Sequence, residues 1–163
     1  NLMYECCARI PLIAHHGGGK IGRGNSQETA TLLDIYPTLL REAGIDFTGT
    51  RLAGKPLHLA SPVTEPDHRT VIGELGNSRH PQYFIREGDW KLIYLDGIHA
   101  RELYNLRDDP RELQDLSGKE PSVCARLLKT LERWLAKEKP YIRSAVPGAD
   151  EVDMAELCRR SNL

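Results

Sequence analysis

The sequence lacks a strong charge of one sign, a long apolar run and a dense set of cysteines. Its 22 lysines and arginines nearly balance 23 aspartates and glutamates, so charge gives no reason to expect nucleic acid or an anionic membrane as partner. No apolar run approaches the about 20 residues that a membrane-spanning helix needs, and we expect no span. Apolar residues make up 40% and charged residues 28% of the 163 residues, which is typical of a globular domain with a core.

The few cysteines argue against a disulfide scaffold. Cys6 and Cys7 are adjacent and do not readily bridge to each other, and two cross-links formed with Cys124 and Cys158 would be sparse. We therefore expect free thiols. The chain starts at Asn1 rather than at a methionine, so the lack of a signal peptide is uninformative, and both a cytoplasmic and a periplasmic or secreted location fit the sequence.

The first part of the chain combines a short apolar run with an amphipathic helix. Residues 9–14 are nearly all apolar, which is typical of a strand covered on both faces in a parallel sheet. After a glycine-rich loop, residues 34–44 predict a helix with Asp34 at its N-cap and Gly44 just beyond its end. Residues 46–69, with three prolines, predict an irregular connection to a second unit. The apolar face of the helix is formed by Ile35, Leu39, Leu40 and Ala43.

Beyond residue 69 the pattern changes to short strands followed by one long helix. Strands are predicted over 70–75, over 83–93 as a hairpin folded at Glu87–Asp89, and over 102–106, which together form an antiparallel meander. A helix predicted over 121–138 should cover one face of this sheet, and prolines break up the tail that follows. Its apolar stripe consists of Val123, Leu127, Leu128, Leu131, Trp134 and Leu135. The fold class that these elements predict is α+β.

Two motifs suggest ligand binding but have simpler explanations. Gly17, Gly19 and Gly22 satisfy the dinucleotide pattern G-x-G-x-x-G, yet no helix starts at Gly22, so a flexible loop is favoured. The pair Asp108-Asp109 precedes a proline and follows a strand, which favours a turn with local hydrogen bonds over a metal site.

Adjacent histidines and cysteines raise a zinc hypothesis. His15-His16 and Cys6-Cys7 lack the C-x₂₋₄-C and H-x₃₋₅-H spacings of zinc sites, and neighbouring residues in a strand point to opposite faces. Packing and surface roles are therefore favoured, and we predict no metal site. The motif G-x-S-x-G is absent, and no nucleophile with a neighbouring base stands out.

Three stretches, in order and with fitting spacing, resemble the sulfatase family. Residues 3–13 resemble M-Y-E-x-x-x-R-V-P-L-I, and residues 31–45 contain a match to D-I-x-P-T-L-L-x-x-A-G-I. Residues 85–94 and 102–113 resemble R-x-G-D-W-K-L-I-Y and E-L-Y-N-L-x-D-D-P-x-E-L. The resemblance runs from Asn1 to about Lys137 and corresponds to the C-terminal part of an arylsulfatase-like protein.

The resemblance implies an alkaline-phosphatase-like fold. Residues 1–69 would form the C-terminal edge of its large α/β domain and the connection. Residues 70–163 would form the C-terminal subdomain, with a four-stranded antiparallel sheet, the helix over 121–138 and a tail. This division agrees with the strand and helix pattern.

The resemblance also implies that the chemistry lies outside this chain. Sulfatases use a formylglycine made from the cysteine of C-x-P-S-R, together with a calcium ion. None of the four cysteines begins that motif, the family's Asp-Asp ligands and Asp-His-Gly segment are absent, and its active-site lysine would precede Asn1. We expect no catalytic residue, metal ligand or cofactor in this chain, and expect both groups in a missing N-terminal sulfatase portion.

Two residues are predicted to recognise substrate. Arg79 and His80 lie in a polar loop that, by the resemblance, lines the mouth of the cleft, where they would bind a sulfated small molecule or sugar. Arg9 would orient structure near the site. Two alternatives stay open: a non-catalytic binding or oligomerisation module, in which the run at 10–14 promotes a homo-oligomer, and a parent enzyme that acts on phosphate or phosphonate monoesters.

Overall fold

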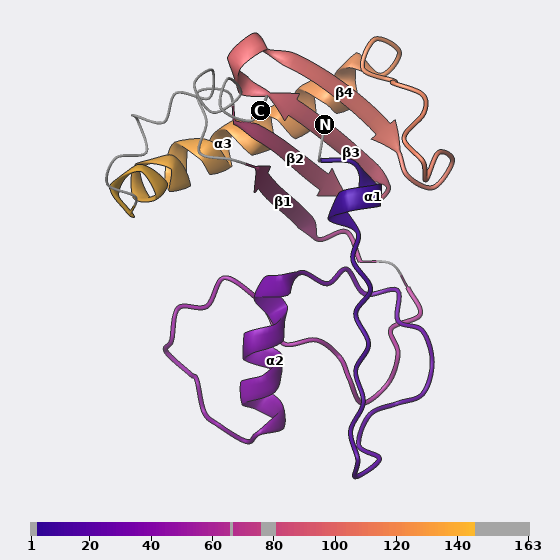
Figure 1. The fold of residues 1–163 in the computed structure, drawn as a ribbon, viewed down its shortest axis with the longest axis vertical. Coiled ribbons are helices and arrows are strands. Elements are labelled where there is room, and N and C mark those ends of the chain that lie inside the picture. Colours follow the sequence, from indigo (N-terminus) through magenta and orange to yellow (C-terminus); the bar gives the residue numbers. More distant parts are fainter. Residues whose placement is uncertain (1–2, 66, 76–80, 146–163) are drawn as a thin grey trace, which may run out of the picture. The chain divides into compact units, whose positions relative to one another are not determined.

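The structure, a computed structural model, describes residues 3–65, 67–75 and 81–145 and consists of two compact units (Figure 1). The sheet unit comprises residues 1–9 and 70–163, and the loop unit comprises residues 10–69. Residues 1–9 group with the sheet, while the place of residues 1–69 at the edge of a larger α/β domain stays a prediction. The grouping of residues 1–9 is supported by an ion pair within the sheet unit, between Glu5 and Lys91.

The sheet unit contains the predicted antiparallel meander. Its strands are β1 (Thr70–Leu75), β2 (Gln82–Glu87), β3 (Trp90–Leu95) and β4 (Ala100–Asn105), in the order β1-β2-β3-β4. The turn between β2 and β3 contains Gly88 at φ 60°, a left-handed conformation that glycine adopts without steric cost. Between β3 and β4 the chain forms a 3₁₀ turn (Asp96–Ile98).

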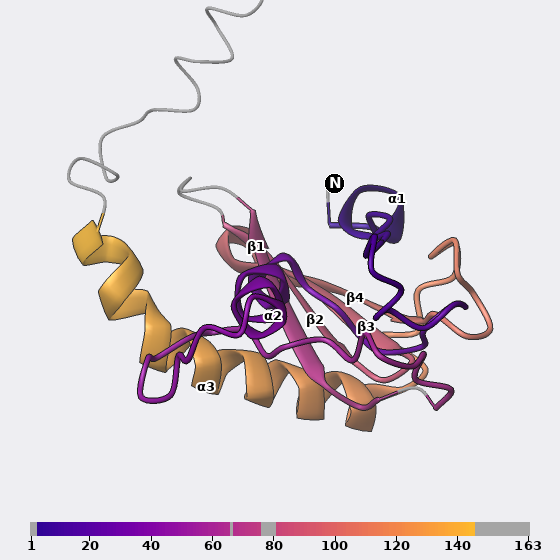
Figure 2. The same cartoon turned by 90° about the horizontal axis from the view of Figure 1, so that it is seen from below.

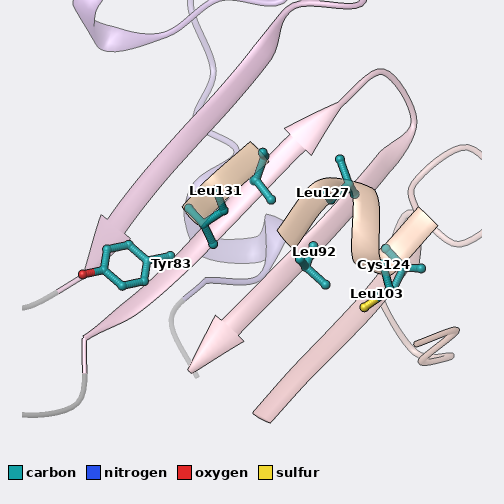
Figure 3. Packing of buried hydrophobic residues seen from close by; sticks show 7 residues of the cluster. Tyr83, Leu92, Leu103, Cys124, Leu127 and Leu131 are labelled. Atoms are coloured by element: carbon teal, nitrogen blue, oxygen red, sulfur yellow. The ribbon is translucent and has the colours of Figure 1, made fainter. Parts of the chain in front are cut away.

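One face of the sheet packs on a long helix, α3 (Pro121–Ala145) (Figure 2). The helix was predicted to end near residue 138 but continues through Pro140 to Ala145. Packing along its first turns sustains the helix against the cost of about 3 kcal/mol that an interior proline carries. No helix among the described residues is long and apolar enough to cross a bilayer. The packed core of this face, seen in Figure 3, consists of Tyr83, Ile85, Leu92, Leu103, Cys124, Leu127 and Leu131.

The predicted stripe on α3 is confirmed, because all six of its residues belong to this core or pack against it. The opposite face of the sheet carries a short helix, α1 (Glu5–Ala8) (Figure 2). Met3, Ile93 and Tyr104 form a second, smaller buried cluster there. Alternation along the strands explains the two clusters, since Leu92 and Ile93 are neighbours in β3 and face opposite sides.

The loop unit has little regular structure. Its described residues form a 3₁₀ turn, η1 (Leu32–Asp34), and a helix, α2 (Ile35–Glu42), which confirms the helix predicted over 34–44. The strand predicted over residues 9–14 is wrong: these residues form no strand, and Ile13 is 90% exposed. A strand of the doubly covered kind needs neighbours in a parallel sheet, and the described residues of this unit contain none.

Apolar side chains of the loop unit lie mostly at its surface. The predicted apolar face of α2 is not buried as a whole, since Leu39 is 62% exposed while Pro37 and Thr38 are the buried residues of this helix. Large exposed apolar residues of the unit are Ile10, Leu12, Ile13, Leu32, Leu33, Tyr36, Leu39 and Ile45.

Candidate functional site

The predicted substrate-binding residues receive no structural test. Arg79 and His80 lie outside the described residues. Arg9 is exposed at the C-terminal end of α1, where its backbone N–H donates to the Glu5 carbonyl at 2.9 Å. The role of all three side chains stays a prediction.

A buried cluster of charges joins α1 to the sheet. Lys91 Nζ lies 2.9 Å from Glu5 Oε1, to which it donates a hydrogen bond, and 2.9 Å from Glu112 Oε1. Arg86 Nη1 lies 3.7 Å from the second oxygen of Glu5. The Glu5 backbone N–H also donates to Glu112 Oε2. Two cations thus face two carboxylates, so the cluster is neutral as a whole.

Complete burial makes this pairing necessary. The side chain of Lys91 is 0% exposed and that of Glu112 is 1% exposed, and an unpaired charge at such a position would cost several kcal/mol. Lys91 Nζ also lies 5.1 Å from the centre of the Phe84 ring, a cation–π contact. Glu112 has φ 55°, a conformation that costs a non-glycine residue about 1–2 kcal/mol and that these contacts hold in place.

A second polar contact holds α1 beside this cluster. Tyr4 Oη donates to Glu102 Oε2 at 2.8 Å, and Tyr104 Oη donates to the same oxygen at 3.1 Å. Burial raises the pKa of Tyr104, and its hydrogen bond to Glu102 raises the pKa further, so the hydroxyl stays protonated. The segment from Met3 to Ala8 is therefore fixed by polar contacts and by the buried Met3 side chain.

In the loop unit, Asp34 is the centre of a comparable arrangement. Its carboxylate is 0% exposed and accepts two hydrogen bonds from Arg69, at 2.6 and 2.9 Å. The backbone N–H groups of Lys55 and Thr31 donate to it at 2.8 and 2.7 Å. Asp34 occupies the N-cap position of α2, as we expected, but its side chain makes no capping hydrogen bond to that helix. The side chain instead forms a capping box with Thr31 at the start of η1.

The ionised form of Asp34 is the stable one. Burial alone would raise the pKa of this carboxyl, but hydrogen bonds from Arg69 and from the backbone of Lys55 and Thr31 outweigh burial and lower it. Nearby, Lys55 Nζ lies 3.0 Å from Asp67 and 3.5 Å from Glu28. The pKa values of Glu28 and Asp67 are lowered in the same way, against the effect of burial.

The interpretation of the acidic pair as a turn is confirmed. Asp109 Oδ2 accepts the backbone N–H groups of Leu113 and Gln114, both at 2.8 Å. These local bonds use the carboxylate, which agrees with a turn rather than a metal site.

The described part of the chain shows no metal centre, and an open hollow lies at the end of α2. No group of three or more metal-ligating side chains occurs among the described residues. An open hollow of about 440 Å³ at the end of α2 is lined by Arg41, Asp46 and Phe47 among others. Within this hollow, Arg41 already donates from Nε and Nη2 to Glu42 and to the Leu57 carbonyl.

Sequence reasoning missed the buried charge cluster, although a signal was present. Lys91 lies in the apolar strand W-K-L-I-Y-L, two positions before Ile93 and therefore on the same face of the sheet. Its position thus predicted burial. A lysine in an apolar, inward position needs buried carboxylate partners. Glu5 and Glu112, far away in sequence, could not be identified as those partners without the fold.

Comparisons with known proteins agree with the resemblance. A family model described as N-sulphoglucosamine sulphohydrolase, C-terminal, matches residues 1–139. Arylsulfatase K of Danio rerio is 34% identical over 137 residues, which cover 79% of this chain and 26% of that protein. N-acetylglucosamine-6-O-sulfatase of Bacteroides thetaiotaomicron is 32% identical over 173 residues, covering 98% of this chain and 30% of that protein.

The solved structure of a 2-O GAG sulfatase matches with a TM-score of 0.56 and 26% identity, covering 69% of this chain and 26% of that protein. The α+β fold is therefore that of the C-terminal part of sulfatases with the alkaline-phosphatase-like fold. The chain spans between a quarter and a third of the length of the curated relatives named above.

Proposed function

This chain belongs to the N-sulphoglucosamine sulphohydrolase C-terminal family of sulfatases, and from that membership we propose that it serves as the C-terminal part of a sulfuric ester hydrolase and is inert alone. The single observation that supports this most directly is the buried cluster of Glu5, Lys91 and Glu112. These residues come from separate stretches of the sulfatase-like signature. The signature in this chain thus corresponds to a structural joint rather than to a reaction centre.

The catalytic groups would come from another part of the protein. Calcium binding requires several oxygen ligands around one ion, and no group of three or more His, Cys, Asp or Glu side chains that could hold a metal ion occurs among the described residues. The described residues therefore do not fit a calcium site. We propose that calcium and the formylglycine both belong to an N-terminal sulfatase portion.

We propose a sulfated sugar as the substrate of the complete enzyme, with Arg79 and His80 binding its anionic groups. Support comes from the relatives, which are described as a 6-O-sulfatase of N-acetylglucosamine and a 2-O GAG sulfatase. A guanidinium can bind the oxygens of a sulfate through two parallel hydrogen bonds, as it does with phosphate. Arg9 would support the arrangement of α1 rather than touch the substrate.

The exposed apolar residues of the loop unit support the same proposal. Ile10, Leu12, Ile13 and Leu39 are each more than half exposed, which is unfavourable for a unit that stands alone. In the proposed enzyme the α/β domain covers them. This surface also supports the second candidate, a non-catalytic module that uses it to form a homo-oligomer.

Two assays test the proposal. The 163-residue chain, with calcium present, should hydrolyse neither a chromogenic aryl sulfate nor the matching aryl phosphate. Turnover of either ester by the chain alone would contradict its inertness. If the chain instead forms a monodisperse, inactive oligomer, and its native gene encodes no further sulfatase portion, the non-catalytic module would be favoured.

The role of the two predicted binding residues is tested in the complete enzyme. Replacing Arg79 and His80 by alanine should raise KM for a sulfated sugar at least about tenfold, since a charge-assisted hydrogen bond contributes about 1.5–3 kcal/mol. The matched control is Lys129→Ala, an exposed cation on α3. Unchanged kinetics in the double variant would remove both residues from the site.

A further inference from the structure

Two exposed thiols lie side by side on α1. Cys6 and Cys7 are both exposed and free, and their Sγ atoms are 3.8 Å apart. We expected adjacent cysteines to point to opposite faces, as they do in a strand. In the structure they lie in a helical turn, where Cys7 and Ala8 donate backbone hydrogen bonds to the Tyr4 carbonyl, both at 2.9 Å. The turn allows both sulfurs to lie on one side.

The turn that carries the thiols is held in place. The residue before Cys6 is Glu5, which is fixed by Lys91 and Glu112, and Tyr4 is bonded to Glu102. A ligand that uses both sulfurs therefore does not have to order the backbone, which lowers the entropic cost of binding. A disulfide between neighbours would need the sulfurs about 2.0 Å apart, so the helical turn favours the dithiol form.

The distance between the sulfurs fits a two-thiolate metal site. At the zinc–sulfur bond length of about 2.3 Å, an ion bound to two sulfurs 3.8 Å apart has an S–metal–S angle of about 110°, the tetrahedral value. We propose that Cys6 and Cys7 form a binding site for a soft d¹⁰ metal ion of the zinc class, with the other coordination positions filled by water or an external ligand. The site is independent of the proposed sulfatase function.

The binding step balances without electron transfer. Two sulfur–metal bonds form, two S–H bonds break, and two protons are released to solvent for each divalent ion. The hydrogen bond with Cys6 raises the pKa of the Cys7 thiol, so binding of the ion must displace a firmly held proton there. Because binding releases these protons, affinity should rise with pH.

The test is a titration of the full chain with Cd²⁺ under reducing conditions. Thiolate-to-cadmium absorbance should saturate at one ion per chain, with two protons released per ion, and Zn²⁺ should compete. The variant C124A/C158A keeps only the pair and should bind as tightly as the unmodified chain. The variants C6S and C7S should each lose at least about tenfold in affinity, because a chelate becomes a single ligand.

Two outcomes would overturn the site. Binding of unchanged affinity in C6S/C7S would assign the ion to other residues. Saturation at half an ion per chain, with dimer formation, would show thiols shared between chains instead of a chelate within one chain. Circular dichroism of each variant verifies that the serine substitutions, which are at exposed positions, leave the fold intact.

Discussion

The two units of this chain differ in how much apolar surface they bury. The sheet unit places apolar residues between its sheet and α3, and Ile85, Leu92, Leu103, Leu127 and Leu131 are each 0% exposed. Both units bury charged side chains, but the loop unit exposes most of its large apolar residues. Burial of apolar surface is the main driving force of folding, whereas a buried ion pair contributes little net stability. The comparison indicates that the sheet unit is the self-sufficient part.

The largest expected effect on stability follows from removing the charge of Asp34. Asp34→Asn leaves Arg69 without its carboxylate partner, and breaking a buried pair costs about 3–5 kcal/mol. Because little apolar core supports the loop unit, amide hydrogen exchange over residues 31–57 should become rapid while β2 and β3 stay protected. Asp46→Asn, an exposed change in the same unit, is the control. Equal protection in both variants would show that Asp34 is not the centre of the unit.

The next effect lies in the sheet unit. Leu127→Ala removes a fully buried side chain from the core in Figure 3 and should lower the free energy of unfolding by about 2–5 kcal/mol. Thermal unfolding followed by circular dichroism measures this change. Exchange in the loop unit should be nearly unaffected. A loss of less than about 1 kcal/mol would mean that α3 does not form the core of the unit.

Lowering the pH should open the loop unit before the sheet unit, without any mutation. The pKa values of Asp34, Glu28 and Asp67 are lowered in the folded state, so their contributions to stability are complete above about pH 4 and are lost as pH falls through the lowered values. Hydrogen exchange measured from pH 7 to pH 2, corrected for intrinsic rates, should show the loop unit opening first. If the sheet unit opens at a higher pH than the loop unit, the sheet unit is the less acid-stable of the two and this prediction is wrong.

The smallest effect is expected for an apolar residue on α2. Leu39 is 62% exposed, so Leu39→Ala should change the free energy of unfolding of this chain by no more than about 0.5 kcal/mol. The same substitution at Leu127 provides the contrast. In the proposed complete enzyme, where the α/β domain covers this surface, Leu39→Ala should cost clearly more. Equal small effects in both proteins would show that the residue stays exposed.

Local patterns predicted the sheet unit well. β1 was predicted with its observed bounds, and the hairpin turn before β3 was placed correctly, because short strands with turn residues are determined by neighbouring positions. All six residues predicted for the apolar stripe of α3 pack in or against the core, because the period of a helix is fixed. The end of α3 was less predictable, because the effect of Pro140 depends on the packing of the rest of the helix.

Predictions that depend on distant partners were less successful. The apolar run at 9–14 was assigned to a covered strand, but an apolar run specifies burial only when neighbouring strands are present. Asp34 was correctly placed at the N-cap position, but its main side-chain partner, Arg69, lies 35 positions away in sequence and was not predicted. The contact of Lys91 with Glu5 joins residues 86 positions apart, and the spacing of residues in a sequence does not encode such a contact.

The buried joint between Glu5 and Lys91 makes the sheet unit discontinuous in sequence. In topological terms, residues 10–69 are an insertion between α1 and β1. The entropy of closing a loop grows only slowly with its length, so the sheet unit should tolerate large changes in the length of this insertion. A recombinant boundary placed at residue 70, in contrast, would remove Glu5 and leave the ammonium group of Lys91 with a single carboxylate partner, Glu112. Where such a chain can be cut is therefore decided by an ion pair, not by the start of the first strand.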